Sequence, residues 1–292
     1  MIGLKRGTVA LYNHDAEWEN EAERTISVLK ETLGEVVCDI AHVGSTSIKS
    51  IKAKPIIDIA VAVKSFEDVL KNEGKLKENG FYYRPADDLN EQLLFACGSF
   101  YDGTGDEQTH FIHVVKKDSM EWINYINFRD YLNANEDVAK QYEALKTSLA
   151  EKNPEDKGRE KYLAGKHDFI VRTLRTALVK SYLGKTVTVE IDRPIGAPHP
   201  KHPEIIYPIN YGYIPNVFGG DGEELDVYIL GIDEKIEEGD STTVKIIGIV
   251  YRKDDVEDKL AAAPEGMSFT AKEIENIIRF QEQFYNSHVE TE

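Results

Sequence analysis

The chain has 292 residues, of which 41% are hydrophobic, and its formal net charge is −17. This length is comfortable for two globular domains, each with its own core. No apolar run reaches the roughly 18 residues that a membrane helix needs, and the N-terminus lacks the apolar region of a signal peptide. We therefore expect a soluble, cytoplasmic protein with no membrane partner.

The negative charge is concentrated in the C-terminal part. Residues 185–292 carry 10 basic and 22 acidic side chains, whereas residues 1–184 carry 25 and 30. Such a surface repels the phosphates of nucleic acids and attracts divalent cations. We therefore expect no DNA or RNA partner.

The first half alternates helical and strand patterns in an α/β rhythm. Helices are predicted at residues 16–33, 66–78, 119–133, 136–151 and 157–178, and strands at 36–43, 55–63, 82–83, 93–96 and 109–115. The segment KSYLGK at 180–185 carries a turn signal. We take it as the boundary between two domains, at residues 1–179 and 185–292.

Short β-rich runs and Gly, Pro or acidic turns follow this boundary. Strands are predicted at 186–191, 226–230 and 242–251, a pattern that is typical of a small β-barrel. A closing helix is predicted at 271–285, with a buried face formed by Ile274, Ile277, Ile278 and Phe284. The whole chain is thus predicted to be an α+β protein of two domains.

The most informative segment is YPINYGYIPNVFGGDGEELD at 207–226, which we read as one tight turn. Its tyrosines and amides precede three carboxylates, those of Asp221, Glu223 and Asp226. Oxygen ligands of this kind suit Mg²⁺ and phosphoryl chemistry. Taken alone, the acidic part is also typical of a solvated turn between two strands.

The segment resembles the signature of the soluble inorganic pyrophosphatases, which runs Tyr-Pro-x-Asn-Tyr-Gly, a short spacer, then Asp-Gly-Asp-Pro-x-Asp. The resemblance implies a β-barrel with a C-terminal helix that hydrolyses diphosphate with Mg²⁺. It implies catalytic roles for Asp221, Glu223, Tyr211 and Lys259, substrate contacts from Tyr207 and Arg193, and metal ligation by Asp221, Glu223, Asp226, Asp254 and Glu257. His199 and His202 are further candidates for substrate contacts.

Several positions depart from the pyrophosphatase pattern. Glu223 stands where the family has an aspartate close to a general base, and its longer side chain displaces an attacking water by about one bond length, which can cost about a hundredfold in rate. The block RKDDVEDKLAAAP at 252–264 resembles the family's distal Asp-x-Lys element, with Asp254 or Asp255 as the remaining metal carboxylate. The family's upstream lysine is missing. Candidate replacements are Arg193, His199, Lys201, His202 and Arg252.

The N-terminal half carries a second signal, HVGSTS at 42–47 followed by AKPIIDIAVAV at 53–63. These segments, with HFIHVV at 110–115, resemble the GrpB family of the nucleotidyltransferase-like superfamily. The resemblance implies a mixed sheet with helices and a nucleotide held by the turn of Gly44 and Ser45, with Lys54 as a phosphate contact and Asp58 as a metal ligand.

The N-terminal site departs from working transferases at Ala60, which stands where the second strand carboxylate belongs. One aspartate holds two Mg²⁺ ions poorly, so we expect slow or absent transfer. His110 and His113 have odd spacing on a strand and should therefore point to opposite faces.

Together these segments predict Mg²⁺-dependent hydrolysis of diphosphate or a related phosphoanhydride by the C-terminal domain. The predicted partners are diphosphate or another phosphorylated small molecule, with a nucleotide at the N-terminal domain. Two alternatives stay open: hydrolysis of a different phosphate compound, and a degenerate two-domain binding module without catalysis.

Overall fold

The computed structural model describes residues 1–88, 91–155, 160–219, 222–255 and 257–292. Contacts divide the chain into two compact units, Met1–Ile170 and Val171–Glu292. The division falls inside helix α8 (His167–Tyr182), and the boundary that we place at residues 180–184 stays a prediction. No helix in these described ranges is long and apolar enough to cross a membrane.

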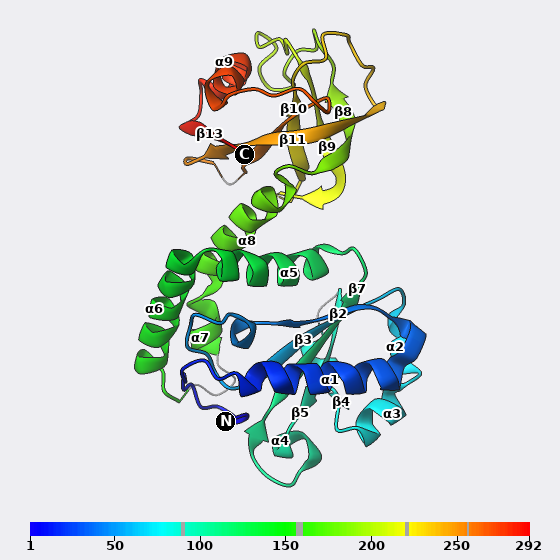
Figure 1. Ribbon diagram of the computed structural model, residues 1–292, viewed down its shortest axis with the longest axis vertical. Helices are drawn as coiled ribbons and strands as arrows, with labels where there is room; N and C mark the ends of the chain where they lie inside the picture. Colours follow the sequence, from blue (N-terminus) through cyan, green and yellow to red (C-terminus); the bar gives the residue numbers. More distant parts are fainter. Residues whose placement is uncertain (89–90, 156–159, 220–221, 256) are drawn as a thin grey trace. The chain divides into compact units, whose positions relative to one another are not determined.

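The N-terminal unit is built on a five-stranded mixed sheet (Figure 1). Its strand order is β2 (Val37–Val43), β3 (Ile57–Val63), β7 (His110–Lys116), β5 (Gln92–Cys97) and β4 (Tyr82–Tyr83). β3 and β7 run parallel, and the other neighbours are antiparallel. A small separate sheet pairs β1 (Leu4–Lys5) with β6 (Glu107–Gln108).

The two faces of the larger sheet differ because side chains alternate along β3. Ile57, Ile59 and Val61 are buried in the same core as Trp18 of helix α1 (Glu17–Leu33). Asp58 therefore lies on the opposite face, against which helix α5 (Met120–Ala134) packs. This face is the candidate site of the N-terminal unit.

The remaining helices of the N-terminal unit are short, except one. They are α2 (Phe66–Leu70), α3 (Glu73–Glu78), α4 (Ser99–Asp102), α6 (Glu136–Lys152), α7 (Glu160–Ala164) and the 3₁₀ turns η1 (Gly34–Val36), η2 (Ser45–Ser47) and η3 (Pro85–Asp87). The helix predicted at 66–78 is thus broken in two. Asn72 lies at the break, where its side chain donates to the Asp68 carbonyl at 2.9 Å and competes with the backbone.

The helix predicted at 157–178 is also divided, into α7 and α8, and residues 156–159 lie outside the described part. The other three helices predicted for this unit have close counterparts in the structure, as do its five predicted strands. Periodicity therefore located the sheet and its main helices correctly.

The C-terminal unit is a closed five-stranded barrel with a helix (Figure 1). Its strands neighbour one another in the order β8 (Thr186–Arg193), β9 (Asn210–Phe218), β10 (Glu224–Ile229), β12 (Lys259–Ala263) and β11 (Ser241–Arg252). β11 pairs back with β8 and closes the barrel, and β13 (Ser287–Thr291) pairs with the far end of β11. The predicted α+β class with a C-terminal barrel is confirmed.

The interpretation of residues 207–226 as one tight turn is wrong, because Asn210–Phe218 form strand β9 between β8 and β10. The Tyr-Gly pair in this strand has a steric reason. A Cβ atom at Gly212 would lie 1.9 Å from the carbonyl oxygen of Glu190, so this position accepts no side chain. The glycine thus allows β8 and β9 to approach closely.

Helix α9 (Ala271–Glu282) ends earlier than the predicted 285, and part of its predicted buried face is wrong. Ile274 and Ile278 are buried as predicted, but Phe284 lies beyond the helix end and is 64% exposed. Gln281 and Glu282 are buried instead, each 5% exposed. They continue the helical spacing of the two isoleucines and carry polar groups into the barrel.

Candidate active site

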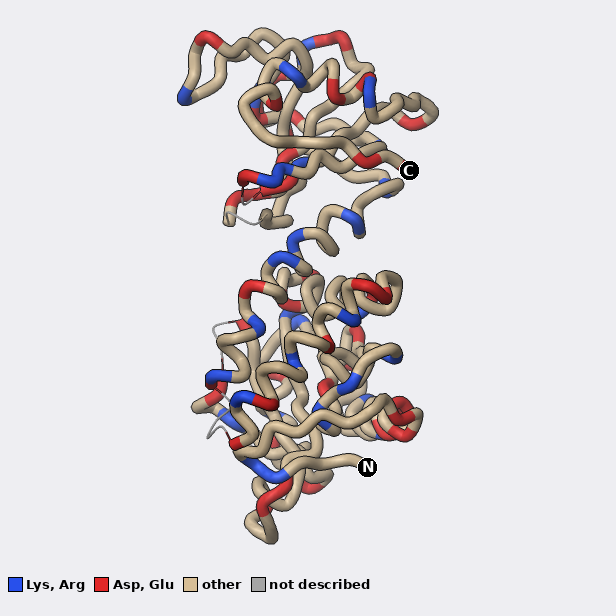
Figure 2. Tube along the Cα trace, turned by 90° about the vertical axis from the view of Figure 1, so that its left-hand side faces the viewer, with Lys and Arg blue, Asp and Glu red and all other residues tan. Residues whose placement is uncertain are grey.

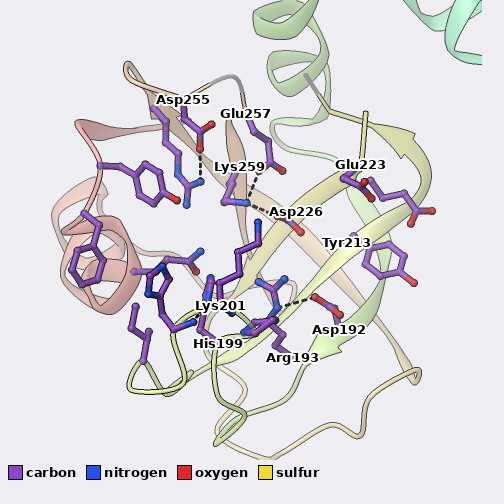
Figure 3. Close-up of a pocket in the computed structure, with 18 of the residues that line it drawn as sticks. Asp192, Arg193, His199, Lys201, Tyr213, Glu223, Asp226, Asp255, Glu257 and Lys259 are labelled. Carbon is purple, nitrogen blue, oxygen red and sulfur yellow. Dashed lines mark hydrogen bonds and ion pairs between the residues drawn. The ribbon is translucent and has the colours of Figure 1, made fainter. Parts of the chain in front are cut away.

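A cavity of about 810 Å³ opens in the barrel. The ionisable residues that line it are Asp192, Arg193, His199, Lys201, His202, Glu204, Tyr213, Glu223, Glu224, Asp226, Arg252, Asp255, Glu257, Lys259 and Tyr285. Figure 3 shows Arg193, His199 and Lys201 on one side and Asp255, Glu257 and Lys259 on the opposite side. The cavity thus gathers most of the residues predicted from the pyrophosphatase-like motifs.

Lys259 is a buried cation in this lining. Its side chain is 3% exposed, and its Nζ donates to Tyr211 Oη at 2.8 Å and to Glu257 Oε2 at 2.7 Å. It also forms a short ion pair with Asp226. Burial lowers the pKa of Lys259, but Asp226 and Glu257 raise it more, so the net shift is upward. The ammonium therefore stays charged at neutral pH.

The Asp226–Lys259 pair results from the barrel topology. β10 and β12 run parallel, with Val227 paired to Leu260, so that Asp226 and Lys259 lie at the same end of adjacent strands. On the other side of β10, Asp226 pairs in register with Tyr213 of β9. The strand order therefore brings the tyrosine segment and the 252–264 block together.

Arg252 forms a second buried ion pair. Its side chain is 2% exposed and bonds Glu282 of α9 through Nη2 at 2.5 Å and Nε at 3.1 Å. Nη1 of Arg252 donates to Asp255 at 2.9 Å, and Tyr285 stacks 3.7 Å from the guanidinium. Burial opposes the charge, but the hydrogen bonds to Glu282 raise the pKa of Arg252 overall. This arginine is held by protein carboxylates.

Tyr207 and Tyr211 are fully buried, so their hydroxyls act on side chains that line the cavity. The Tyr207 hydroxyl accepts from Arg193 Nη1 at 2.7 Å and donates to Gln281 at 3.0 Å. Arg193 also pairs with Asp192 at 3.0 Å. The predicted tyrosines thus orient Arg193 and Lys259, which face the cavity.

Negative charge predominates in the lining. The described lining residues include seven carboxylates but four lysines or arginines. Three of these cations, Arg193, Arg252 and Lys259, already form ion pairs with carboxylates. Lys201 is exposed, and the described part of the chain offers it no carboxylate within 4.0 Å. The cavity therefore attracts cations more than bare anions.

The carboxylates suit a hard divalent cation in their chemistry, because Mg²⁺ prefers oxygen ligands. Among the residues that the structure describes, however, no group of three or more His, Cys, Asp or Glu is arranged to hold a metal ion. Asp226 and Glu257 share the ammonium of Lys259 instead. Asp221 lies outside the described residues. The donor set therefore fits Mg²⁺, but the described carboxylates do not converge on one position.

Three other predicted residues of the barrel differ in their placement. Glu223 lines the cavity on the loop before β10, and Figure 3 shows it near Asp226. Of the two alternatives in the distal block, Asp255 lines the cavity, whereas Asp254 accepts bonds from the Asn286 amide at 2.9 and 3.1 Å. Asp255 is the better placed of the two.

His199 and His202 both line the cavity. The His199 ring stacks parallel to the Tyr207 ring, with centroids 6.2 Å apart. Burial, and to a smaller extent the positive charge of Arg193, lowers the pKa of His199. The His202 side chain is 61% exposed and lies 3.4 Å from Glu204. His199 is thus the more fixed of the two.

Sequence reasoning missed the residues that hold the distal block in place. Arg175 of α8 bonds Asp258 through Nε at 2.8 Å and the Asp255 carbonyl through Nη1 at 2.6 Å. It also bonds the Arg252 carbonyl at 3.1 Å. Arg175 is 83 residues from Asp258, and no motif links them.

In the N-terminal unit the structure brings together the Gly44 turn, Asp58 and His113. A Cβ atom at Gly44, whose φ is +69°, would lie 2.3 Å from Asp58 Oδ2, so glycine is required there. His113 Nε2 lies 3.3 Å from Asp58 Oδ1, whereas His110 pairs with Glu21 of α1. The two histidines do face opposite sides of the sheet, as their spacing predicts.

The turn at Gly44 and Ser45 leads only into the single 3₁₀ turn η2, and Ser47 Oγ donates to the Gly44 carbonyl at 2.6 Å. His42 lies beside it, with Nε2 2.9 Å from Thr46 Oγ1, and burial lowers the pKa of His42 to about 4. Lys54 lines a cavity of this unit whose described lining does not include Gly44 or Ser45. The role of Lys54 as a phosphate contact of the Gly44–Ser45 turn therefore stays a prediction.

Comparison with known proteins agrees with the division into two units. The family model described as inorganic pyrophosphatase matches residues 181–290. An inorganic pyrophosphatase of Campylobacter jejuni is 30% identical over 93 residues, which cover 30% of this chain and 54% of that protein. The barrel therefore resembles the pyrophosphatases over part of their length.

The N-terminal similarity is stronger. The glutamate-rich protein GrpB of Alkalihalophilus pseudofirmus is 45% identical over 157 residues, which cover 53% of this chain and 89% of that protein. The crystal structure of a conserved GrpB protein from Enterococcus faecalis superimposes with a TM-score of 0.54 at 29% identity, covering 59% of this chain and 99% of that one. The family model described as GrpB protein matches residues 8–176, more than half of the chain, and the chain therefore belongs to the GrpB family.

Proposed function

We propose that the barrel hydrolyses diphosphate or a related phosphoanhydride in the presence of Mg²⁺. The observation that carries this proposal is the buried Lys259 ammonium, held by Tyr211, Asp226 and Glu257 at the side of a cavity with excess carboxylates. A fixed ammonium suits a phosphate oxygen, and the excess carboxylates suit the metal that accompanies such a substrate.

The charge balance supports a metal requirement. A bare diphosphate would be repelled by the surplus of carboxylates, whereas divalent cations would neutralise both. We infer that Asp226, Glu223 and Glu257 hold Mg²⁺. When bound, Mg²⁺ would lower the pKa of a coordinated water and offset the charge of the phosphates. Arg193 and Lys201, on the opposite side of the cavity, would bind the phosphate oxygens (Figure 3).

The test is phosphate release from diphosphate and from a panel of other phosphate compounds, measured with and without Mg²⁺. Asp226→Asn should lower phosphate release at least about 100-fold, because it removes a charged oxygen ligand and a partner of Lys259. Asp233→Asn is the matched control, since Asp233 is exposed and does not line the cavity.

The outcomes separate the alternatives. Phosphate release that Asp226→Asn leaves unchanged would contradict the proposed site. Absence of release from every compound by the unaltered protein would favour a binding module without catalysis. Release from another compound but not from diphosphate would assign the barrel to that compound.

For the N-terminal unit, we infer that a nucleotide binds beside Gly44 and Ser45, next to Asp58. Calorimetric titration with nucleoside triphosphates and Mg²⁺ should detect binding that Ser45→Glu abolishes, because the new carboxylate repels phosphates at this turn. Rapid nucleotide transfer would show that another carboxylate replaces the one that is missing at Ala60.

A further inference from the structure

A second cavity, of about 230 Å³, lies in the N-terminal unit and has the opposite charge character. Its described lining includes three basic side chains, Arg6, Lys54 and Arg84, and one carboxylate, Asp87. Arg84 Nε lies 3.0 Å from Asp87, so this carboxylate offsets the charge of one of the three basic side chains, and basic side chains remain in excess in the described lining. In a chain with a net charge of −17, such a cavity is a local positive site.

The three basic side chains come from separate segments of the fold. Arg6 follows β1, Lys54 precedes β3, and Arg84 follows β4. Each lies over an aromatic ring: Arg6 4.4 Å from Phe100, Lys54 5.0 Å from Tyr162 and Arg84 5.3 Å from Tyr101. Ring contacts of this kind orient a cationic group. Long-range folding therefore brings three oriented cations to one cavity.

The floor of this cavity belongs to the sheet. Leu94 and Phe111 line it, and the strand registers place Phe111 next to Asp58 and Leu94 next to His113. Because paired residues of adjacent strands point to the same side, the floor lies on the Asp58 face of the sheet. Leu163 of α7 adds an apolar side chain to the lining. The cavity thus combines a basic rim with an apolar floor.

Two further lysines, Lys166 and Lys146, lie in the same unit. Lys166 lies 4.7 Å from the same Tyr162 ring as Lys54. Lys146 is 1% exposed, and its ammonium donates to the Lys52 carbonyl at 2.6 Å. Burial, and to a smaller extent the positive charge of Lys166, lowers the pKa of Lys146 to about 7. Glu143 acts on the pKa of Lys146 in the opposite sense, so these buried lysines add less to the cavity than the three basic side chains of its lining.

We propose that this cavity binds a small organic phosphate. Its phosphate group would accept hydrogen bonds from Lys54, Arg84 and Arg6, and its apolar part would pack against Phe111 and Leu163. The volume is below the roughly 300–1,000 Å³ of typical ligand sites, so a compact phosphate ester fits better than a whole nucleotide. This site does not depend on hydrolysis by the barrel.

The test uses the full chain and phenyl phosphate as the probe, titrated by calorimetry in EDTA so that no divalent metal is present. Lys54→Gln and Arg84→Gln should each weaken binding at least about 10-fold, because each removes a charge-assisted hydrogen bond. Leu163→Trp should weaken it as well, since a larger side chain fills the cavity without changing the charge.

The matched control is Lys116→Gln, which removes the same charge from a lysine over an aromatic ring, Phe66 at 4.3 Å, outside this cavity. Its binding should equal that of the unaltered protein. The proposal is overturned if phenyl phosphate shows no saturable binding, if Lys54→Gln and Arg84→Gln bind normally, or if Lys116→Gln loses as much. Loss of binding in Lys201→Gln, a barrel variant, would also overturn it by placing the phosphate in the other unit.

Discussion

Replacing Lys259 by methionine tests whether the barrel carboxylates can hold a metal. The change removes the ammonium that lies between Asp226 and Glu257. Glu257 is 8% exposed at its side chain and Asp226 is 21% exposed, so two largely enclosed carboxylates lose their common counter-ion. Methionine keeps most of the apolar stem of the lysine, so the effect is chiefly electrostatic.

Two opposing effects determine how far Lys259→Met changes the free energy of unfolding. Breaking a buried ion pair by removing one partner costs about 3–5 kcal/mol, and the lost bond to the Tyr211 hydroxyl adds about 1 kcal/mol. A cation that binds the vacated position stabilises the folded barrel by about 2.7 kcal/mol at a concentration 100 times its Kd. We therefore expect Lys259→Met to be strongly destabilised in EDTA and to regain a substantial part of that loss in Mg²⁺.

The assay is calorimetric unfolding of the unaltered protein and the variant, each in EDTA and in Mg²⁺ at matched ionic strength. Mg²⁺ should raise the Tm of Lys259→Met more than that of the unaltered protein. If the variant does not fold, Asp226→Asn combined with Lys259→Met removes one of the two uncompensated charges. An equal response of both proteins to Mg²⁺ would refute the assignment of these carboxylates as metal ligands.

Arg175→Met is the matched control for this experiment. It also removes the cationic partner of a buried carboxylate, because Asp258 is 5% exposed at its side chain. Asp258 does not line the cavity, so Mg²⁺ should not restore the stability of this variant. Recovery of Arg175→Met by Mg²⁺ would mean that the metal acts generally on the barrel surface.

Two further predictions concern Glu223 and His42. Glu223→Asp should raise diphosphate hydrolysis by up to about 100-fold if the longer glutamate side chain misplaces the attacking water. If Glu223→Asp instead lowers phosphate release from another phosphate compound, with no gain on diphosphate, the barrel is adapted to that compound. The pKa of His42 is lowered by burial to about 4 in the folded state, against about 6.5 when unfolded, so its contribution to stability is complete above pH 6.5 and is lost as the pH falls toward 4. Between pH 7.5 and 5.0 the free energy of unfolding of the N-terminal unit should fall by about 2 kcal/mol more in the unaltered protein than in His42→Gln. Urea unfolding followed by the fluorescence of Trp18 and Trp122 measures this, because both lie in that unit. An equal fall in both proteins would contradict the prediction.

The fold could be predicted from the sequence where local pattern decides it. The apolar run at 55–63 identified strand β3, and the odd spacing of His110 and His113 identified their opposite orientations. Strand β9 could not be predicted in the same way. The tyrosine segment was interpreted for its chemistry, and the polar and glycine residues within it concealed a strand.

The contacts of the candidate site were harder to predict, because they depend on pairings between distant segments. Asp226 and Lys259 meet through the parallel pairing of β10 and β12, and strand order does not follow from residue types. Glu282 was missed although it lies on the predicted helix. The predicted buried face contained only apolar residues, whereas the helical position of Glu282 puts it against Arg252. A buried charge is predictable only once its partner is known.

The electrostatics of the two cavities imply different ligands for the two units. The barrel cavity has more carboxylates than basic side chains, so a phosphate compound requires accompanying metal ions to enter it. Figure 2 shows acidic residues spread along the chain of both units, yet the lining at Arg6, Lys54 and Arg84 is basic and can accept a phosphate without metal. A chelator should therefore abolish phosphate binding in the barrel while leaving it intact at Lys54. Measuring phosphate binding with and without EDTA distinguishes the two sites in the same intact chain, because binding in the barrel requires the metal and binding at Lys54 does not.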